Sequence, residues 1–214
     1  MVPWLDAILV LLILTSFWLL GSSRLQSCIR AVALQGALLG LVPLFAKWPQ
    51  LTVRLAALAL LSMVIKAVVL PYMLRRAARE ANVRNEVQPL VGFTTSLLLG
   101  IGLWGVAMYM ANRLPLQEPP VSALLVPVAA FTLMCGLLLL VSRNTAVMQV
   151  IGYLALENAV YLFGWAFAIE EPFLLEVGVP LDIFVAVFVM GITIHQISRE
   201  FDTIDTDELA SLKD

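Results

Sequence analysis

Four ionisable side chains interrupt otherwise apolar stretches of this sequence: Lys66, Glu157, Asp182 and, at the end of an apolar run, His195. A charge at the centre of a bilayer costs at least about 2.5–3.5 kcal/mol, so such groups usually face the protein interior and often lie on an ion pathway. We therefore interpret these four residues as a candidate proton relay within the membrane, with Glu157 as its central titratable group.

Each of these residues also has a structural interpretation. Lys66 and Glu157 could belong to interhelical ion pairs or hydrogen bonds. Asp182 closely follows Pro180, so it could lie in the first turn of a helix, near the positive end of the helix dipole. His195 could simply be a residue of the membrane interface. The residue types alone leave these alternatives open.

Several polar residues would support such a relay. Tyr153 and Tyr161 flank Glu157 at a spacing of four residues, which places all three on one face of a helix. Asn158 follows Glu157 directly, and Gln35 is a further polar residue within an apolar segment. We expect the partner of Glu157 to come from another helix or another chain.

The helix that carries Lys66 also contains Pro71. Proline has no backbone N–H and cannot donate to the carbonyl of Ala67, one turn earlier. We therefore expect the helix to loosen just beyond the lysine.

Other chemistries are disfavoured by what the sequence lacks. It contains one histidine and two cysteines, Cys28 and Cys135, which form no CxxC pair. Haem, zinc and iron–sulfur sites use paired histidines or grouped cysteines, and no phosphate-binding loop or nucleophile elbow is present. We predict no cofactor, no metal site and no catalytic centre in this chain, and we expect both cysteines to be small apolar packing residues.

Composition indicates the elements that must position these residues. Of 214 residues, 61% are apolar and 13% are charged, against about a quarter charged in a typical soluble domain. A membrane-spanning helix needs about 20 apolar residues. We predict an all-α polytopic membrane protein with about seven transmembrane helices, near 4–21, 26–46, 51–74, 90–111, 121–141, 145–168 and 177–197.

The spans suggest an internal repeat. Segments 23–45 and 142–164 both open with Ser-Arg and later carry Ala-Leu-Gln or Ala-Leu-Glu. We divide the chain into an N-terminal three-helix unit with its cytoplasmic loop (1–89), a linking helix (90–120), a C-terminal three-helix unit (121–198) and a polar tail (199–214). The two units would form a parallel repeat.

Charge placement predicts the orientation. An N-terminus outside the membrane puts most basic residues on the cytoplasmic side, as the positive-inside rule requires. These are Arg24, Arg30, Arg75, Arg76, Arg79, Arg84, Arg143, Arg199 and Lys213. The C-terminal tail is then cytoplasmic. We expect a multi-pass membrane protein with this orientation.

The C-terminal part resembles subunit K of complex I and the corresponding small membrane component of the multisubunit cation/proton antiporters. The resemblance rests on "SRNTAVMQVIGYLALENAVYLF" (142–163), on "PLDIFVAVFVMGI" (180–192) and on the tail "IDTDELASLKD" (204–214). The whole chain, including "IKAVVLPYMLRRAARE" (65–80), resembles hydrogenase-4 component E of formate hydrogenlyase-type complexes, which contain group 4 NiFe hydrogenases.

The resemblance implies a non-catalytic membrane subunit of an oxidoreductase complex whose redox centres lie in other chains. Its partners would be antiporter-like membrane subunits and hydrogenase or quinone-module subunits, within the lipid bilayer and without nucleic acid. Its carboxylates would contribute to proton translocation. Asp182 matches the second family acid, whereas the first falls near Leu154, about 5 Å, or one turn, from Glu157. Arg143 and Asn144 match the cytoplasmic assembly turn.

Other functions remain open from the residues alone. A stand-alone small-molecule or ion transporter would use the same helices, with its site at the repeat interface. A structural scaffold or a quinone-binding subunit is equally compatible with the composition. The electron donor, the ion and the direction of coupling are not specified by the sequence.

Overall fold

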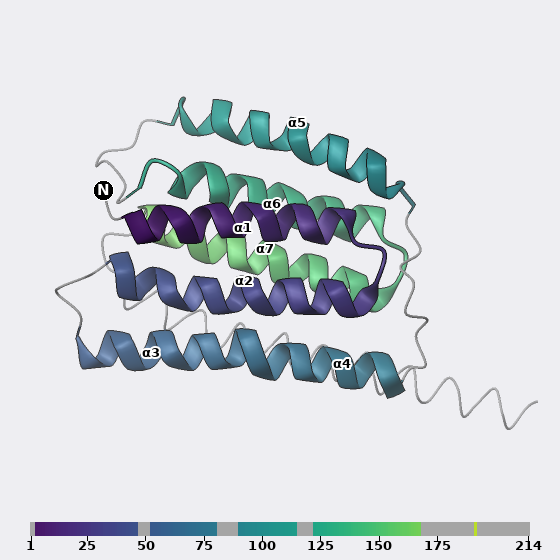
Figure 1. Cartoon of the computed structure of the whole chain (residues 1–214), viewed down its shortest axis with the longest axis horizontal. Coiled ribbons are helices and arrows are strands. Elements are labelled where there is room, and N and C mark those ends of the chain that lie inside the picture. The colour runs from purple at the N-terminus through teal and green to yellow at the C-terminus, as the bar shows by residue number, and fades with distance from the viewer. Residues whose placement is uncertain (1–2, 47–51, 81–89, 115–121, 168–190, 192–214) are drawn as a thin grey trace, which may run out of the picture.

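The computed structural model describes residues 3–46, 52–80, 90–114, 122–167 and 191. Figure 1 shows them as a bundle of roughly parallel and antiparallel helices. The elements are α1 (Pro3–Gly21), α2 (Leu25–Ala46), α3 (Val53–Val64), the π-helix η1 (Ile65–Val69), α4 (Leu70–Glu80), α5 (Phe93–Ala111), α6 (Leu125–Ser142) and α7 (Ala146–Phe167). Because α3, η1 and α4 follow one another without a break, they form one long helix.

The described part of the chain contains six helices long and apolar enough to cross a membrane. They correspond to the first six spans expected from the sequence, so the all-helical, multi-pass membrane architecture is confirmed. The seventh expected span (177–197), with Asp182 and His195, lies outside the described residues apart from Gly191, and so does the tail (199–214).

The third span is longer than the sequence suggested. We expected it to end at residue 74, but α4 continues to Glu80 through the basic residues Arg75, Arg76 and Arg79. Alanine and arginine both favour helix, and Leu74 and Ala77 keep one face of this extension buried. The helix therefore carries its charges on the exposed face, beyond its apolar stretch.

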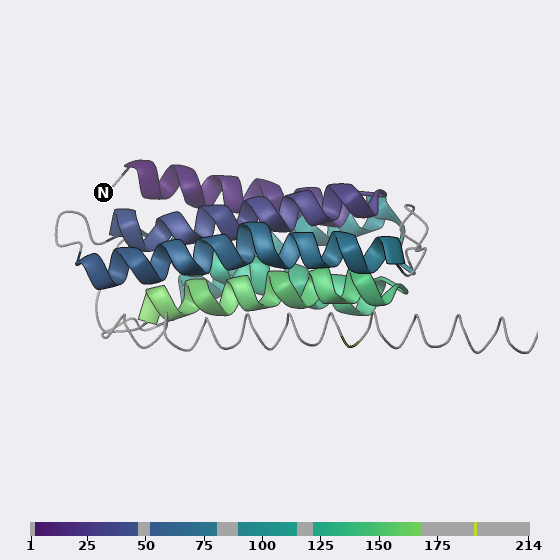
Figure 2. The same cartoon turned by 90° about the horizontal axis from the view of Figure 1, so that it is seen from below.

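Four helices form the centre of the bundle and two lie at its flanks. α1, α2, α6 and α7 pack against one another, while α5 contacts α1 and α6, and the α3–η1–α4 helix contacts α2 and α7 (Figures 1 and 2). The candidate span of α5 is 17% buried, against 67% for those of α6 and α7. Glu157 and Gln35 therefore lie on the central helices α7 and α2, and Lys66 lies on the flanking α3–η1–α4 helix, which contacts them.

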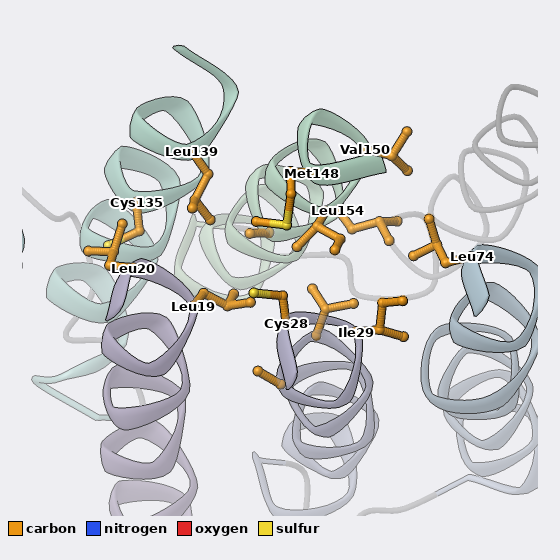
Figure 3. Packing of buried hydrophobic residues seen from close by; sticks show 14 of the residues in the cluster. Leu19, Leu20, Cys28, Ile29, Leu74, Cys135, Leu139, Met148, Val150 and Leu154 are labelled. Carbon is orange, nitrogen blue, oxygen red and sulfur yellow. The ribbon is translucent and has the colours of Figure 1, made fainter. Parts of the chain in front are cut away.

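Apolar side chains from the central helices meet in the cluster shown in Figure 3. Leu19, Cys28, Cys135, Leu139 and Met148 are all buried there. Both cysteines are free thiols. Their place among aliphatic side chains confirms the interpretation of Cys28 and Cys135 as small apolar packing residues.

The α6–α7 hairpin is held at unusually close range by two glycines. A Cβ atom added at Gly136 would lie 2.7 Å from the backbone nitrogen of Leu156, and one added at Gly152 would lie 3.0 Å from that of Leu140. Small residues at such crossings allow the helix backbones to touch, which is how helices associate in a bilayer. The hairpin that carries Glu157 is therefore fixed by backbone contact.

We predict that Gly136→Ala destabilises the protein, because the new methyl group meets backbone atoms and forces α6 and α7 apart. Overpacking of this kind typically costs about 1–3 kcal/mol. Thermal unfolding in detergent should show a lower midpoint for this variant. The matched control is Gly102→Ala, since a Cβ atom there meets nothing within 4 Å. Equal midpoints for the two variants would contradict the close approach of α6 and α7.

Candidate functional site

Lys66 and Glu157 form an ion pair in the interior of the bundle. The Lys66 ammonium Nζ lies 2.8 Å from the Glu157 carboxylate Oε1, and the two side chains are 5% and 3% exposed. Lys66 Nζ also donates a longer hydrogen bond, of 3.5 Å, to Asn158 Oδ1. The structure thus joins two of the four predicted relay residues, 91 positions apart in the chain, and adds the predicted supporting residue Asn158.

The pair is asymmetric at the carboxylate. Glu157 Oε1 accepts the bond from Lys66, whereas Oε2 is buried and accepts no hydrogen bond from the residues that the structure describes. Moving two charges out of water is costly, and their attraction offsets this only when the geometry is good and the remaining lone pairs are satisfied. Among the described residues, only one oxygen of the Glu157 carboxylate is therefore hydrogen-bonded.

Proline shapes the helix that presents Lys66. Pro71 lacks an N–H, and its ring would clash with the carbonyl of Ala67 in a regular α-helix. The helix instead widens into the π-turn η1, in which the Leu70 N–H donates to Ile65 O, five residues earlier. The predicted loosening beyond the lysine is confirmed, and it includes Lys66 itself. Single π-turns inside α-helices frequently occur at functional sites.

Helix α2 packs closely against Lys66 through Gly36. A Cβ atom added at Gly36 would lie 2.6 Å from Lys66 Cβ and 2.8 Å from its carbonyl carbon. Only a residue without a side chain allows α2 to approach this closely. The backbone of α2 therefore lies directly against the backbone and Cβ of Lys66.

Gln35, the neighbour of Gly36, belongs to a second buried polar contact. Its Nε2 donates to Ser16 Oγ of α1 at 3.1 Å, and Ser16 Oγ in turn donates to the carbonyl of Leu12 at 2.9 Å. Gln35 Oε1 is buried and has no partner among the described residues. Because Gly36 abuts Lys66, this Gln35–Ser16 contact lies at the same level of the bundle as the ion pair.

The face of α7 that carries Glu157 is polar along much of its length. Tyr153 is partly buried and Tyr161 is buried, as expected from their spacing around Glu157. Trp165 continues the series four residues later; its side chain is buried and its Nε1 has no hydrogen-bond partner in the described part of the chain. Sequence reasoning missed Trp165, although the same four-residue spacing could have found it.

Arg143 is turned into the protein at the end of α6. Its side chain is buried, Nη2 donates to Leu20 O at 2.8 Å, and Nη1 donates to Val91 O at 3.5 Å. The guanidinium also lies 4.8 Å from the centre of the Phe93 ring. Burial lowers the pKa of this group from its ordinary value, but arginine remains protonated in proteins. Arg143 therefore joins α1, α5 and α6, while the adjacent Asn144 is exposed.

A further polar contact lies at the opposite end of the bundle. Ser122 Oγ donates to Asp6 Oδ1 at 2.5 Å and accepts from the Leu124 N–H at 3.1 Å. It links the first turn of α1 to the segment that precedes α6. Sequence reasoning did not single out this contact, because a carboxylate in the first turn of a helix is common. Within the described ranges, no group of three or more His, Cys, Asp and Glu residues could hold a metal ion.

Together these features define a multi-pass helical membrane protein with a lysine–glutamate pair buried between its helices. The chain is 31% identical over 204 residues to the uncharacterized protein Rv0085 of Mycobacterium tuberculosis, which covers 95% of this chain and 93% of that protein. It belongs to the same family as that protein.

The chain is also similar to a named hydrogenase component. It is 29% identical over 152 residues to hydrogenase-4 component E of Escherichia coli strain K12 and of Shigella flexneri, which covers 70% of this chain and 69% of each relative. No protein-family model matches the chain, and no solved structure matches it. The resemblance to hydrogenase-4 component E is thus confirmed as sequence similarity, whereas the resemblance to subunit K remains a prediction.

We predict strong coupling between Lys66 and Glu157 in a double-mutant cycle. Lys66→Met or Glu157→Gln alone should lower the free energy of unfolding, because each removes one partner of a buried ion pair, a change that typically costs about 3–5 kcal/mol. The double variant should recover part of this loss. Equilibrium unfolding in mixed micelles measures all four proteins.

The matched control for removal of a basic residue is Arg75→Gln, on the exposed face of α4. It should change the free energy of unfolding little, since exposed charges contribute little to stability. Additive effects of Lys66→Met and Glu157→Gln would show that the two groups do not depend on each other and would contradict the pair.

Proposed function

We propose that this chain is a non-catalytic membrane subunit of a hydrogenase-like or complex I-like redox complex, in which the Lys66–Glu157 pair takes part in proton translocation. The observation that carries the proposal is a titratable pair buried between two membrane-spanning helices, in a chain similar to hydrogenase-4 component E. Intramembrane ionisable groups of this kind commonly belong to ion pathways.

The pair provides a mechanism for binding and releasing a proton. While the Lys66 ammonium lies 2.8 Å from Glu157, the carboxylate is stabilised in its charged form. When the lysine moves away or its charge is neutralised, a carboxylate in a low-dielectric interior favours the protonated form. A change in charge or position elsewhere in the complex could therefore load Glu157, and return of the lysine would release the proton. Glu157 Oε2, which is free of donors among the described residues, is the atom at which we place the exchange.

Neighbouring polar residues supply the continuation of the pathway. Tyr153 and Tyr161 lie one turn to either side of Glu157 on one face of α7, and a tyrosine hydroxyl can both accept and donate a hydrogen bond. Asp182 and His195 would continue the relay on the span expected at 177–197. Because packed helix axes lie about 8–10 Å apart, transfer between helices would require water between the side chains.

The proposal includes partners and an orientation. The redox centres would lie in hydrogenase or quinone-module subunits, and antiporter-like membrane subunits would lie beside this chain in a bacterial or archaeal plasma membrane. The N-terminus would be outside and the tail (199–214) cytoplasmic. In this arrangement residues 121–198 would be the subunit K-like unit, and the exposed Asn144 would face a partner at the cytoplasmic turn.

We predict that Glu157→Gln lowers the number of protons translocated per electron, while electron transfer by the complex continues. Glutamine keeps the shape of glutamate but cannot titrate. The measurement is proton uptake or release by vesicles that contain the native complex, driven by its own redox reaction, with electron transfer recorded in parallel. A wild-type proton ratio in this variant would show that Glu157 is structural.

The double variant Lys66→Met/Glu157→Gln distinguishes a loss of proton relay from a loss of stability. It should regain stability through loss of both charges, yet it should remain uncoupled because no titratable group is restored. Thr132→Val is the matched control, since Thr132 is a buried polar residue whose hydroxyl donates to the carbonyl of Val128 in its own helix. Recovery of coupling together with stability in the double variant would contradict the proposal.

We also predict that the tagged chain, extracted in mild detergent from its native membrane, copurifies with hydrogenase-like and antiporter-like subunits. Its apolar flanks, such as the largely exposed α5, are compatible with neighbours in the membrane. Mass spectrometry of the purified complex identifies the companions. A stable homo-oligomer without other chains would favour the stand-alone transporter instead.

A further inference from the structure

A pocket of about 520 Å³ opens on the surface of the bundle where α1 turns into α2. One wall is apolar and consists of Leu14 and Phe17 of α1 with Leu97 of α5. The other end is polar and includes Ser22, Ser23 and Arg24 of the turn. The pocket thus changes from apolar to polar along the direction in which α1 leaves its membrane-spanning segment at Gly21.

Trp18 places the pocket at the depth of the lipid headgroups. Its ring lines the pocket and is 46% exposed, and its indole N–H donates to Ser27 Oγ at 2.8 Å. Tryptophan is enriched where the hydrocarbon core meets the headgroup region. The apolar wall therefore faces the depth of the acyl chains and the turn faces the depth of the phosphates.

The polar end of the pocket carries a positive charge. The exposed Arg24 side chain makes no hydrogen bond or ion pair with the residues that the structure describes, and none of the described carboxylates lines the pocket. The carbonyl of Arg24 accepts the N–H groups of Ser27 and Cys28, so α2 begins here with the positive end of its dipole. Arg143, bound to Leu20 O just behind the pocket, adds a second cation with no carboxylate partner in the described ranges.

We propose that this pocket binds an anionic glycerophospholipid. The phosphodiester would accept hydrogen bonds from the Arg24 guanidinium and from the hydroxyl group of Ser23, a charge-assisted arrangement that favours phosphate, whereas the Ser22 hydroxyl already donates to the carbonyl of Arg24. One acyl chain would lie against Leu14 and Leu97. Basic pockets between transmembrane helices bind anionic headgroups in this way. The site is distinct from the Lys66–Glu157 pair and does not depend on the proposed function.

The test is native mass spectrometry of the full chain in micelles that contain equal amounts of phosphatidylglycerol and phosphatidylcholine with identical acyl chains. The wild-type protein should retain phosphatidylglycerol preferentially. Arg24→Gln should reduce this preference roughly fivefold, as expected for loss of one basic contact near a membrane surface, and Arg24→Lys should keep most of it. Ser23→Glu should abolish the preference for phosphatidylglycerol, because it adds a negative charge beside Arg24 where the net anionic lipid would bind.

The matched control is Arg30→Gln, which removes an exposed arginine of α2, the helix that follows Arg24, but does not line the pocket. It should leave the preference close to that of the wild type. Equal losses in Arg24→Gln and Arg30→Gln would show a diffuse surface-charge effect and overturn the proposal. Absence of any preference in the wild type would overturn it as well. Displacement of the lipid by an equal concentration of glycerol 3-phosphate would show a site for small anions instead, because a lipid site derives part of its affinity from the acyl chain.

Discussion

The burial of one cation and one anion between membrane helices is the constraint on which the arrangement of this bundle depends. Neither charge is tolerable alone in a medium of low dielectric, so the helix of Lys66 and the helix of Glu157 must lie side by side with the two groups in contact. α2 closes against the same place through Gly36, whose missing side chain leaves room for Lys66. The positions of three helices are thus tied to one interaction.

The two partners of the pair lie in helical segments with different hydrogen-bond patterns. Glu157 lies on α7 next to Leu156, whose backbone nitrogen is in near contact with Gly136 of α6, so its helix is fixed by backbone packing. Lys66 lies within a π-turn that Pro71 imposes, where the regular hydrogen-bond pattern is interrupted. Gly36 of α2 lies against the Lys66 backbone as closely as Gly136 of α6 lies against Leu156, so both partners are held by close backbone packing. They differ in hydrogen bonding, because Lys66 lies in a single π-turn, a feature that often occurs at functional sites.

Sequence reasoning found the membrane spans, the ionisable residues and the effect of Pro71, because each follows from local composition and covalent geometry. It did not find that Lys66 and Glu157 are partners. Apolar residues surround both, so hydropathy indicates burial without indicating which helices meet, and the contact depends on close approach at Gly36, Gly136 and related sites. It also placed Arg143 on a cytoplasmic turn by the positive-inside rule, whereas the guanidinium turns inward to backbone carbonyls that only the tertiary structure brings together.

Stability alone gives a poor account of why this pair is present. Buried ion pairs are often no more stabilising than apolar residues of similar volume, and they are least favourable when some of their hydrogen-bonding capacity is unused. Glu157 Oε2 and Gln35 Oε1 both have unused capacity among the described residues. A purely structural polar contact would be expected to satisfy these atoms, as Asp6 and Ser122 satisfy each other at the far end of the bundle. The proposed proton exchange needs an oxygen that is not permanently occupied by a donor, and among the described residues Glu157 Oε2 is such an atom.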